Sequence, residues 1–434
     1  MSTLSIEIEP RKIDADAVKV VRRLKRHGFE AYLVGGCVRD LLLGCTPKDF
    51  DVATSATPNE IRGLFRNSRI IGRRFRLVHI FFGPKIIETA TFRQKPPTES
   101  EEKEPSDGDS DDKEPDDKEP DDDALLIRRD NVWGSAMDDA LRRDFTLNGL
   151  FYDPVRGEVI DFVDGLDDLA SRSIRTIGEP DIRFLEDPVR ILRAIKFAAR
   201  LGLTIEARTL EALTTHADRI MACARARVLE EIYRLFREGA AARAMTLLEE
   251  TGVRRVLLPE LDCVATDPAR WELLQARLTA LDTLAGEAPL TNPVLIGALY
   301  FDTIIDSKRI FGPGVDGPAE LVQELRTVLT NWGPSRKDRD STQQILMAQR
   351  RLRPDDRKKG RRRRPAALVA QAYFHEALVL HKLFCHTGEA DPSTLGKWEA
   401  LEATTRRSGA DAGQRRRSPR TRRRRRPRRR GREG

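Results

Sequence analysis

The feature that most constrains this chain is a short apolar run that ends in two glycines and is soon followed by two aspartates. The run Ala31–Val34 precedes Gly35-Gly36-Cys37-Val38-Arg39-Asp40, and Asp49-Phe50-Asp51 follows. Residues i and i+2 of a strand point to the same face, so Asp49 and Asp51 are predicted to project together beside a turn with bare backbone N–H groups. Paired carboxylates suit a divalent metal, and N–H groups with Arg39 suit phosphate.

Two further polar motifs strengthen this prediction, because two aspartates alone also occur in ordinary solvated turns. Arg142-Arg143-Asp144-Phe145-Thr146-Leu147-Asn148 supplies two cations, a third carboxylate and an amide. Glu186-Asp187-Pro188-Val189-Arg190, with Arg193 beyond it, marks the start of a predicted helix. Asp187 and Arg190 are three residues apart and would therefore share one helical face.

In this order, the three motifs resemble those of the class II template-independent nucleotidyltransferases, the family of bacterial poly(A) polymerases and CCA-adding tRNA nucleotidyltransferases. The resemblance implies an α/β nucleotidyltransferase head, a small mixed sheet with helices, followed by an α-helical neck and body. It implies an enzyme that transfers AMP from ATP to RNA 3′ ends, releases pyrophosphate and promotes mRNA turnover. Two Mg²⁺ ions are the expected cofactors, and ATP and RNA are the expected partners. The sequence identifies no protein partner.

The resemblance also assigns the catalytic carboxylates. Asp49 and Asp51 are expected to hold the metal ions. Asp144 is expected to be the third acidic residue of the active site. Glu88 is an alternative for that third role, because it lies on a predicted neighbouring strand.

Binding of the nucleotide is expected to involve all three motifs. The glycines would let the backbone approach the triphosphate, since a Cβ atom there would intrude. Arg39 would contact the β- and γ-phosphates, and Asn148 the ribose. In the family, the Asp and Arg of the last motif read the edge of the incoming base without a template. The expected nucleotide-binding residues are Gly35, Gly36, Arg39, Arg142, Arg143, Asn148, Asp187, Arg190 and Arg193.

The stretch Ile70–Gly83 favours the poly(A) polymerase branch of the family. CCA-adding enzymes typically have a Gly-Thr pair where this chain has Arg76-Leu77. CCA addition to tRNA remains an alternative, as does an RNA-binding protein with an inactive head, although the intact set of motif residues argues against the latter. Basic residues outside the motifs are expected to bind RNA, and they are Arg73, Arg74, Arg76, Arg361, Arg362, Arg363 and Arg364.

The formal net charge of +8 hides a strong asymmetry along the 434 residues. Residues 96–123 contain fifteen Asp or Glu against three Lys, and residues 406–434 contain fifteen Arg against two acids. Neither composition can bury a core, so the first is predicted to be a disordered acidic insertion in the head and the second a disordered tail. A tail this rich in arginine suits a polyanion such as RNA.

The predicted elements divide the chain into four parts. A helix and a strand are expected over 15–34, a strand over 50–53, two strands over 77–92, and mostly helices beyond 163. The predicted domains are a head (1–162), a neck for nucleotide selection and RNA binding (163–262), an RNA-binding body (263–405) and the tail (406–434).

No apolar run approaches the roughly 20 residues that a membrane span needs, and no signal peptide is recognisable. The five cysteines are scattered, which is typical of reduced thiols. A cytoplasmic protein is therefore expected.

Overall fold

The computed structural model describes residues 2–5, 8–72, 76–94, 132–287, 290–304, 317–329, 333–353 and 365–405. The acidic insertion, the arginine-rich tail and six of the expected RNA-binding residues (Arg73, Arg74 and Arg361–Arg364) lie outside this set. Two compact units divide between Pro259 and Glu260. The expected boundary between head and neck, after residue 162, lies inside the first unit.

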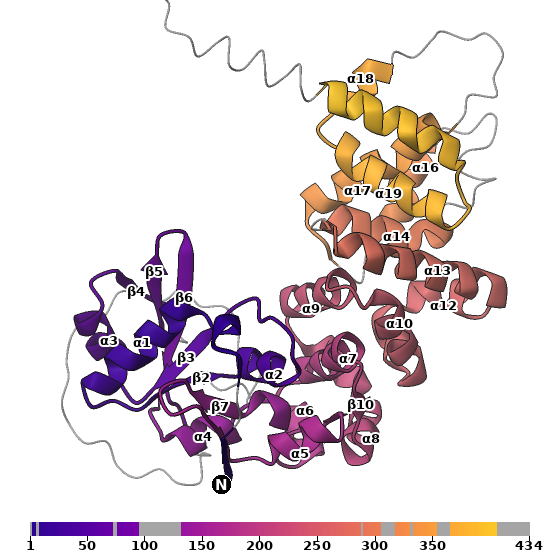
Figure 1. Ribbon diagram of the computed structural model, residues 1–434. Helices are drawn as coiled ribbons and strands as arrows, with labels where there is room; N and C mark the ends of the chain where they lie inside the picture. Colours follow the sequence, from indigo (N-terminus) through magenta and orange to yellow (C-terminus); the bar gives the residue numbers. More distant parts are fainter. Residues whose placement is uncertain are drawn as a thin grey trace, which may run out of the picture. The chain divides into compact units, whose positions relative to one another are not determined.

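A mixed sheet forms the core of the first unit (Figure 1). Within the described residues it has eight strands, of which β3 and β6 run parallel and the other neighbours run antiparallel. In sheet order the strands are β1 (Ser2–Ser5), β8 (Glu158–Asp161), β7 (Leu150–Asp153), β2 (Ala31–Val34), β3 (Asp51–Thr54), β6 (Lys85–Thr91), β5 (Leu77–Phe82) and β4 (Ser68–Ile71).

Helices cover both faces of this sheet because each helix has one apolar side. On one face, α1 (Ala15–Arg26) and α3 (Pro58–Leu64) contribute to a core with the inward side chains of β2, β3, β5 and β6. A capping box begins α3, with the Thr57 backbone N–H donating to Glu60 at 2.7 Å. On the opposite face, α4 (Ala136–Leu141) packs its small residues against Ala53 of β3.

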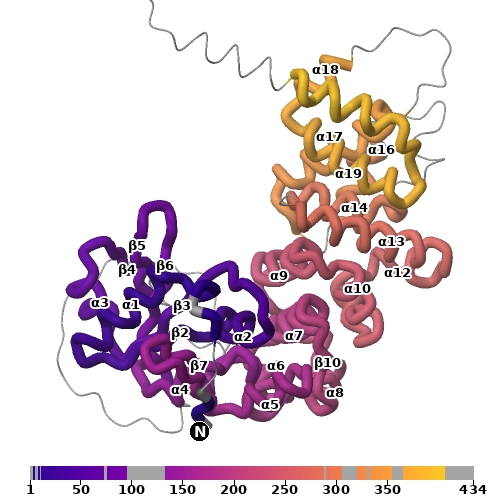
Figure 2. Tube along the Cα trace, in the orientation of Figure 1, coloured from indigo at the N-terminus to yellow at the C-terminus, as the bar shows by residue number. Residues whose placement is uncertain are grey.

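The middle of the sheet positions two acidic residues. In the parallel pair β3 and β6, Asp51 lies in register with Glu88. Strands β5 and β6 form a hairpin that projects beyond the neighbouring strands (Figure 2). The β4–β5 register pairs His79 with Arg69, and the hairpin register pairs His79 with Glu88.

The rest of the first unit is largely helical. Helix α7 packs against α9 and α10, and Lys196 of α7 donates to Glu231 of α9 at 2.6 Å. A short parallel ladder joins β9 (Ser173–Ile174) to β10 (Thr204–Ile205). The other elements are α2 (Gly36–Leu42), η2 (Thr146–Asn148), α5 (Gly165–Ala170), α6 (Pro180–Glu186), α7 (Val189–Leu201), α8 (Ala207–Thr215), η3 (Ala217–Ala222), α9 (Arg225–Arg237), α10 (Ala241–Glu250) and α11 (Val253–Leu257).

The second unit is helical throughout its described residues. The fully buried Arg277 organises its core, because the guanidinium donates to Glu389 at 2.6 Å and to Asp302 at 3.1 Å. Its helices include α13 (Pro268–Ala285), α14 (Asn292–Ile304), α16 (Gly317–Val328), α17 (Arg336–Leu352), α18 (Pro365–Val369) and α19 (Phe374–His386). The predicted fold class, an α/β head followed by helices, is confirmed. Among the helices described, none has the length and apolar composition to cross a membrane.

Candidate active site

The two aspartates that follow the glycine pair, Asp49 and Asp51, lie at the start of β3. The strand begins at Asp51, so the expected strand over 50–53 starts one residue too early, and Asp49 lies in the preceding loop. Both residues are exposed. Asp51 alternates with the buried Val52, which places its side chain on the face of the sheet covered by α4.

Asp51 is surrounded by charge. Desolvation by the protein atoms around it, although the side chain remains open to solvent, raises the pKa of Asp51 to about 6. The negative charges of Glu88 and Asp49 contribute to this rise, and the positive charge of Arg143 opposes it. Three carboxylates therefore repel one another at this point of the sheet, and a cation would relieve that repulsion.

Glu88, the alternative third carboxylate, lies on the strand next to Asp51. It is the register partner of Asp51 on β6, it is exposed, and His79 Nε2 lies 3.4 Å from its carboxylate. In the part of the chain that the structure describes, no group of three His, Cys, Asp or Glu side chains is already arranged around a metal position. The side chains of Asp49, Asp51 and Glu88 nevertheless supply carboxylate oxygens, which are the donors that Mg²⁺ prefers.

The glycine pair forms the turn between β2 and α2. Gly35 has φ +70° and ψ −130°, a conformation that side chains rarely adopt, and its N–H donates to the Leu150 carbonyl at 3.2 Å. A Cβ atom on Gly35 would lie 2.9 Å from Arg143 Nη1, whereas one on Gly36 would make an ordinary contact at 3.6 Å with Arg39. The need for glycine at position 35 therefore arises within the protein itself.

Replacing Gly35 by alanine is expected to destabilise the first unit by about 1–3 kcal/mol and to displace Arg143. Gly44→Ala is the matched control, because Gly44 also has a positive φ (+75°) but open space around its Cβ position. Gly36→Ala should leave stability unchanged. Thermal melting of all three variants tests the predicted loss of stability, and ATP binding tests the predicted displacement of Arg143. A Gly35→Ala variant that behaves like Gly44→Ala in both measurements would contradict it.

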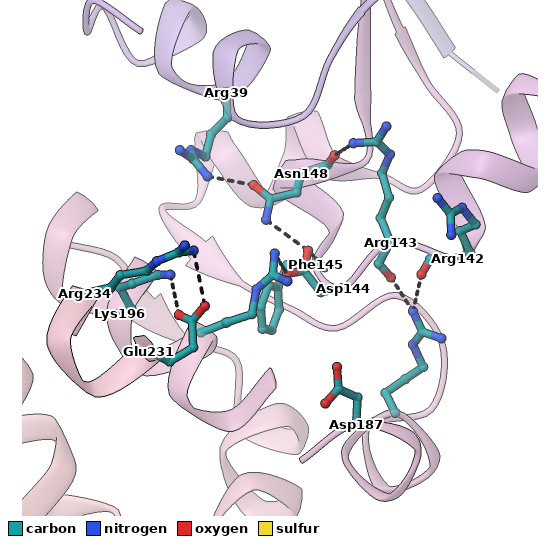
Figure 3. Close-up of polar contacts among 12 residues, drawn as sticks. Arg39, Arg142, Arg143, Asp144, Phe145, Asn148, Asp187, Lys196, Glu231 and Arg234 are labelled. Carbon is teal, nitrogen blue, oxygen red and sulfur yellow. Dashed lines mark hydrogen bonds and ion pairs between the residues drawn. The ribbon is translucent and has the colours of Figure 1, made fainter. Parts of the chain in front are cut away.

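Arg39 does not present a free guanidinium to a phosphate. It is buried and donates to Asn148 Oδ1 at 2.7 Å (Figure 3). It also donates to Asp40 at 2.6 Å and lies 5.0 Å from the ring centre of Phe197 on α7. Its expected contact with the β- and γ-phosphates stays a prediction, because these bonds use only part of the guanidinium. Asp40 in turn accepts from Arg200 of α7 at 2.9 Å.

Asp144 and Asn148 belong to the same buried network. The Asn148 amide donates to Asp144 at 3.0 Å, the Phe145 N–H donates to Asp144 at 2.9 Å, and Arg193 of α7 forms an ion pair with Asp144 at 2.7 Å. Burial raises the pKa of Asp144, but the Arg193 charge and these hydrogen bonds outweigh it and hold the pKa below its usual value. Asp144 thus fastens η2 to α7, and the roles expected for Asp144 as an active-site carboxylate and for Asn148 as a ribose ligand stay predictions.

Arg142 and Arg143 are held by one buried carboxylate. Asp139 of α4 accepts from Arg142 at 3.1 Å and from Arg143 at 2.8 Å. Burial raises the pKa of Asp139, and the two guanidinium charges lower it below its usual value. Arg143 also donates to the Asn148 carbonyl (Figure 3), which leaves it between the glycine turn and the carboxylates around Asp51.

Asp187 and Arg190 flank the break between α6 and α7. Asp187 Oδ2 accepts from Arg227 of α9 at 2.9 Å. Arg190 Nη1 donates to the Arg183 carbonyl at 2.8 Å and to Glu186 at 3.2 Å. A cavity of about 310 Å³ lies nearby between α7 and α9, and it is lined by Val189, Arg193, Ala226, Arg227, Glu230 and Glu231.

Several of these contacts were not predicted from the motifs. Arg183 donates to the carbonyl oxygens of both Arg142 and Arg143, which ties the second motif to α6. On α7, Arg193, Phe197 and Arg200 recur at intervals of four and three residues and all contact the head motifs. Their spacing, which places them on one face of the helix, was a signal in the sequence that this face packs against the head. Among the expected RNA-binding residues, Arg76 is described and exposed, just before β5.

Known proteins with related sequences support the resemblance. Residues 31–175 match the family model described as "Poly A polymerase head domain", and residues 202–264 match "Probable RNA and SrmB-binding site of polymerase A". The chain is 38% identical over 302 residues to poly(A) polymerase I of Haemophilus influenzae, covering 68% of this chain and 63% of that protein. It is 35% identical over 241 residues to the CCA-adding enzyme of Geobacillus thermodenitrificans, covering 56% and 54%. The chain thus spans less than two thirds of either relative.

The fold is also similar to a solved structure. The crystal structure of the Bacillus stearothermophilus CCA-adding enzyme in complex with CTP aligns with a TM-score of 0.60 and 25% identity. The alignment covers 91% of this chain and 82% of that one. With both family models matched and related sequences in both branches, this chain belongs to the family of poly(A) polymerases and CCA-adding nucleotidyltransferases.

Proposed function

We propose that this chain is a polynucleotide adenylyltransferase that transfers AMP from ATP to the 3′ ends of RNA without a template. The 3′ hydroxyl would attack the α-phosphate, and pyrophosphate would leave. The observation that carries this proposal is the cluster of Asp51 on β3, Glu88 on β6 and Asp49 just before β3, which lies near Arg143 beside the glycine turn. A role in mRNA turnover follows if the tails are added to messenger RNA.

The residues at this site fit divalent metal ions. All three candidate ligands are carboxylates, and the raised pKa of Asp51 reflects charge that a cation would neutralise. Asp49 and Asp51 are the proposed ligands, and Glu88, in register with Asp51, is proposed for the third place in preference to the buried Asp144. Two Mg²⁺ ions, when bound there, would neutralise charge on the attacking and leaving oxygens.

The protein's own groups would position the substrates. Arg142 and Arg143, oriented by Asp139, are the proposed triphosphate contacts, together with N–H groups at the turn. Arg39, Asn148 and Asp144 form a chain of contacts that ends at Arg193 of α7. Their proposed role is to hold the glycine turn against α7.

Base selection is proposed to occur beside α7. Asp187 would accept from the exocyclic amine of adenine, and Arg190 would donate to a ring nitrogen. The cavity between α7 and α9 adjoins both positions, since Val189 and Arg227 line it. Binding of the RNA primer is assigned to the basic residues Arg73, Arg74, Arg76 and Arg361–Arg364, and to the neck, body and arginine-rich tail expected from the sequence.

CCA addition is the second candidate, and the similarity to a CCA-adding enzyme in complex with CTP favours it. Poly(A) addition is preferred because the poly(A) polymerase relative has the higher identity over a longer alignment, and because Arg76-Leu77 replaces the Gly-Thr pair of CCA-adding enzymes.

An incorporation assay with Mg²⁺ tests the proposal and separates the two candidates. Purified protein would receive a generic RNA with a free 3′ end, or a tRNA lacking CCA, with ATP, CTP or both. Long tails on the generic RNA from ATP alone are expected. Addition that needs CTP and stops at CCA would establish the second candidate. If no RNA is extended, the proposal fails, and an RNA-binding protein with an inactive head remains.

A further inference from the structure

The two oxygens of the Asp187 carboxylate have different surroundings. Oδ2 accepts a hydrogen bond from Arg227 Nη2 at 2.9 Å. Oδ1 is buried and accepts no hydrogen bond from any residue that the structure describes. A buried acceptor without a donor is unfavourable and is common where a ligand completes the pairing.

Arg227 is the side chain that orients this carboxylate. Asp187 is the C-terminal cap of α6, with an extended backbone (φ −151°, ψ 91°) and its N–H donating to the Arg183 carbonyl at 3.3 Å. By contrast, Arg190 is fixed by the Arg183 carbonyl and by Glu186. Within the described part of the chain, the orientation of the Asp187 carboxylate therefore depends on a single partner, which comes from another helix.

Arg227 also borders a cavity beside this contact. Arg227 lines the cavity of about 310 Å³ between α7 and α9, a volume typical of small-ligand sites. Its side chain is 53% exposed, so it is not a core residue whose loss would unfold the helix. Lys196 and Glu231 join α7 to α9 independently, at 2.6 Å, and would keep the helices together without it.

We propose that Arg227 is a positioning residue that makes the base site select an exocyclic amine over a carbonyl. By holding Oδ2, it presents Oδ1 as an acceptor to the 6-amino group of adenine. Guanine has a carbonyl oxygen at that position, and two acceptors facing each other repel. This inference rests on the proposed function, and it adds a residue of α9 to the specificity determinants on α7.

The test is the preference for ATP over GTP in variants of Arg227, at saturating RNA and Mg²⁺. Arg227→Ala is expected to raise the KM for ATP about 10-fold with less than about a 3-fold change in kcat, and to lower the ATP-to-GTP preference about 10-fold. Arg227→Lys should restore most of the preference. Arg225→Ala is the matched control, because Arg225 is an exposed arginine of the same helix. Thermal melting confirms that each variant folds.

A double-mutant cycle shows whether Arg227 acts through Asp187. In an Asp187→Asn background, Arg227→Ala should add little further loss of preference, because the carboxylate that it orients is gone. The inference is overturned if Arg227→Ala keeps the preference that Arg225→Ala keeps, or if its effect adds in full to that of Asp187→Asn.

Equilibrium binding of ATP and of GTP to the same proteins separates a failure of the proposed function from a failure of the inference about Arg227. If the wild-type chain extends no RNA, the proposed function fails. A preference for ATP in binding that is lost in Arg227→Ala still supports the inference in that case, and binding without any preference, or with an unchanged one, overturns it.

Discussion

Asp51→Asn is expected to lower the rate of AMP incorporation roughly 10³-fold while leaving the protein at least as stable as the wild type. The loss follows because the variant removes a charged ligand where the attacking and leaving oxygens must be neutralised. The stability follows from the raised pKa of Asp51, since a carboxylate whose charge is disfavoured in the folded state by desolvation and by Glu88 costs nothing to neutralise. Incorporation kinetics and thermal melting on one preparation measure both effects.

A variant that loses activity but keeps its stability identifies a functional residue, whereas a structural residue loses both. Asp167→Asn is the control, because Asp167 is an exposed carboxylate on α5, and both activity and melting temperature should stay at wild-type values. Asp49→Asn should resemble Asp51→Asn. If Asp51→Asn retains more than a tenth of the wild-type rate, or if its activity falls only in step with its stability, Asp51 is not a metal ligand.

The sequence allowed the position of this site to be predicted, but not every contact in it. Alternation and glycine placement located β2, β3 and the turn, because those signals depend on neighbouring residues alone. The register of β3 against β6, which brings Glu88 beside Asp51, depends on pairing across more than thirty residues. A residue's neighbour on the next strand is set by the whole sheet, and a motif that is local in sequence does not contain it.

The roles of Arg39 and Asn148 show a second limit. Both were predicted to touch substrate because polar residues in a motif beside glycines suit phosphate and ribose. The structure pairs them with each other and with Asp144 and α7, and their contact with substrate stays a prediction. Polar residues in a motif can serve either the ligand or the packing between two elements, and the composition of the motif is the same in both cases. The spacing of Arg193, Phe197 and Arg200 on α7 was the signal for the second role.

The strand at the edge of the sheet, β1, shows a third limit of prediction from the sequence. Ser2–Ser5 forms β1 against β8, yet its sequence Ser-Thr-Leu-Ser has little apolar content and too few residues for a periodicity. Its strand is defined by backbone pairing with β8, which is an interaction between distant segments. Long amphipathic helices such as α1, in contrast, were predictable because their apolar stripe repeats within the helix itself.

Asp144→Ala is expected to lower the free energy of unfolding of the first unit by about 2–3 kcal/mol, which corresponds to a fall in melting temperature of roughly 5–10 °C. Asp144 is buried, and its removal leaves Arg193 without its ion-pair partner and the Asn148 amide without its acceptor. This is less than the roughly 3–5 kcal/mol typical of a broken buried pair, because the Arg193 side chain is 40% exposed and can be solvated. Urea unfolding and thermal melting measure the change.

Glu88→Gln is the comparison that decides which residue is the third catalytic carboxylate. Glu88 is exposed on β6, so its variant should keep the wild-type melting temperature and lose about 10²-fold or more in kcat. Asp144→Ala should show the opposite balance, with lost stability and an activity that recovers when the assay temperature is lowered. If the two patterns are exchanged, Asp144 acts at the metal site and Glu88 is a surface residue.

The dependence on pH provides an independent check on Asp144. Because the pKa of Asp144 is lower in the folded protein than in the unfolded chain, its contribution to stability is complete above the unfolded pKa of about 3.9. That contribution is lost as the pH falls through the still lower folded pKa. The difference in unfolding free energy between wild type and Asp144→Ala should therefore be constant near neutral pH and shrink below about pH 4. A difference that persists unchanged into strong acid would mean that Asp144 stabilises the fold by packing, without its charge.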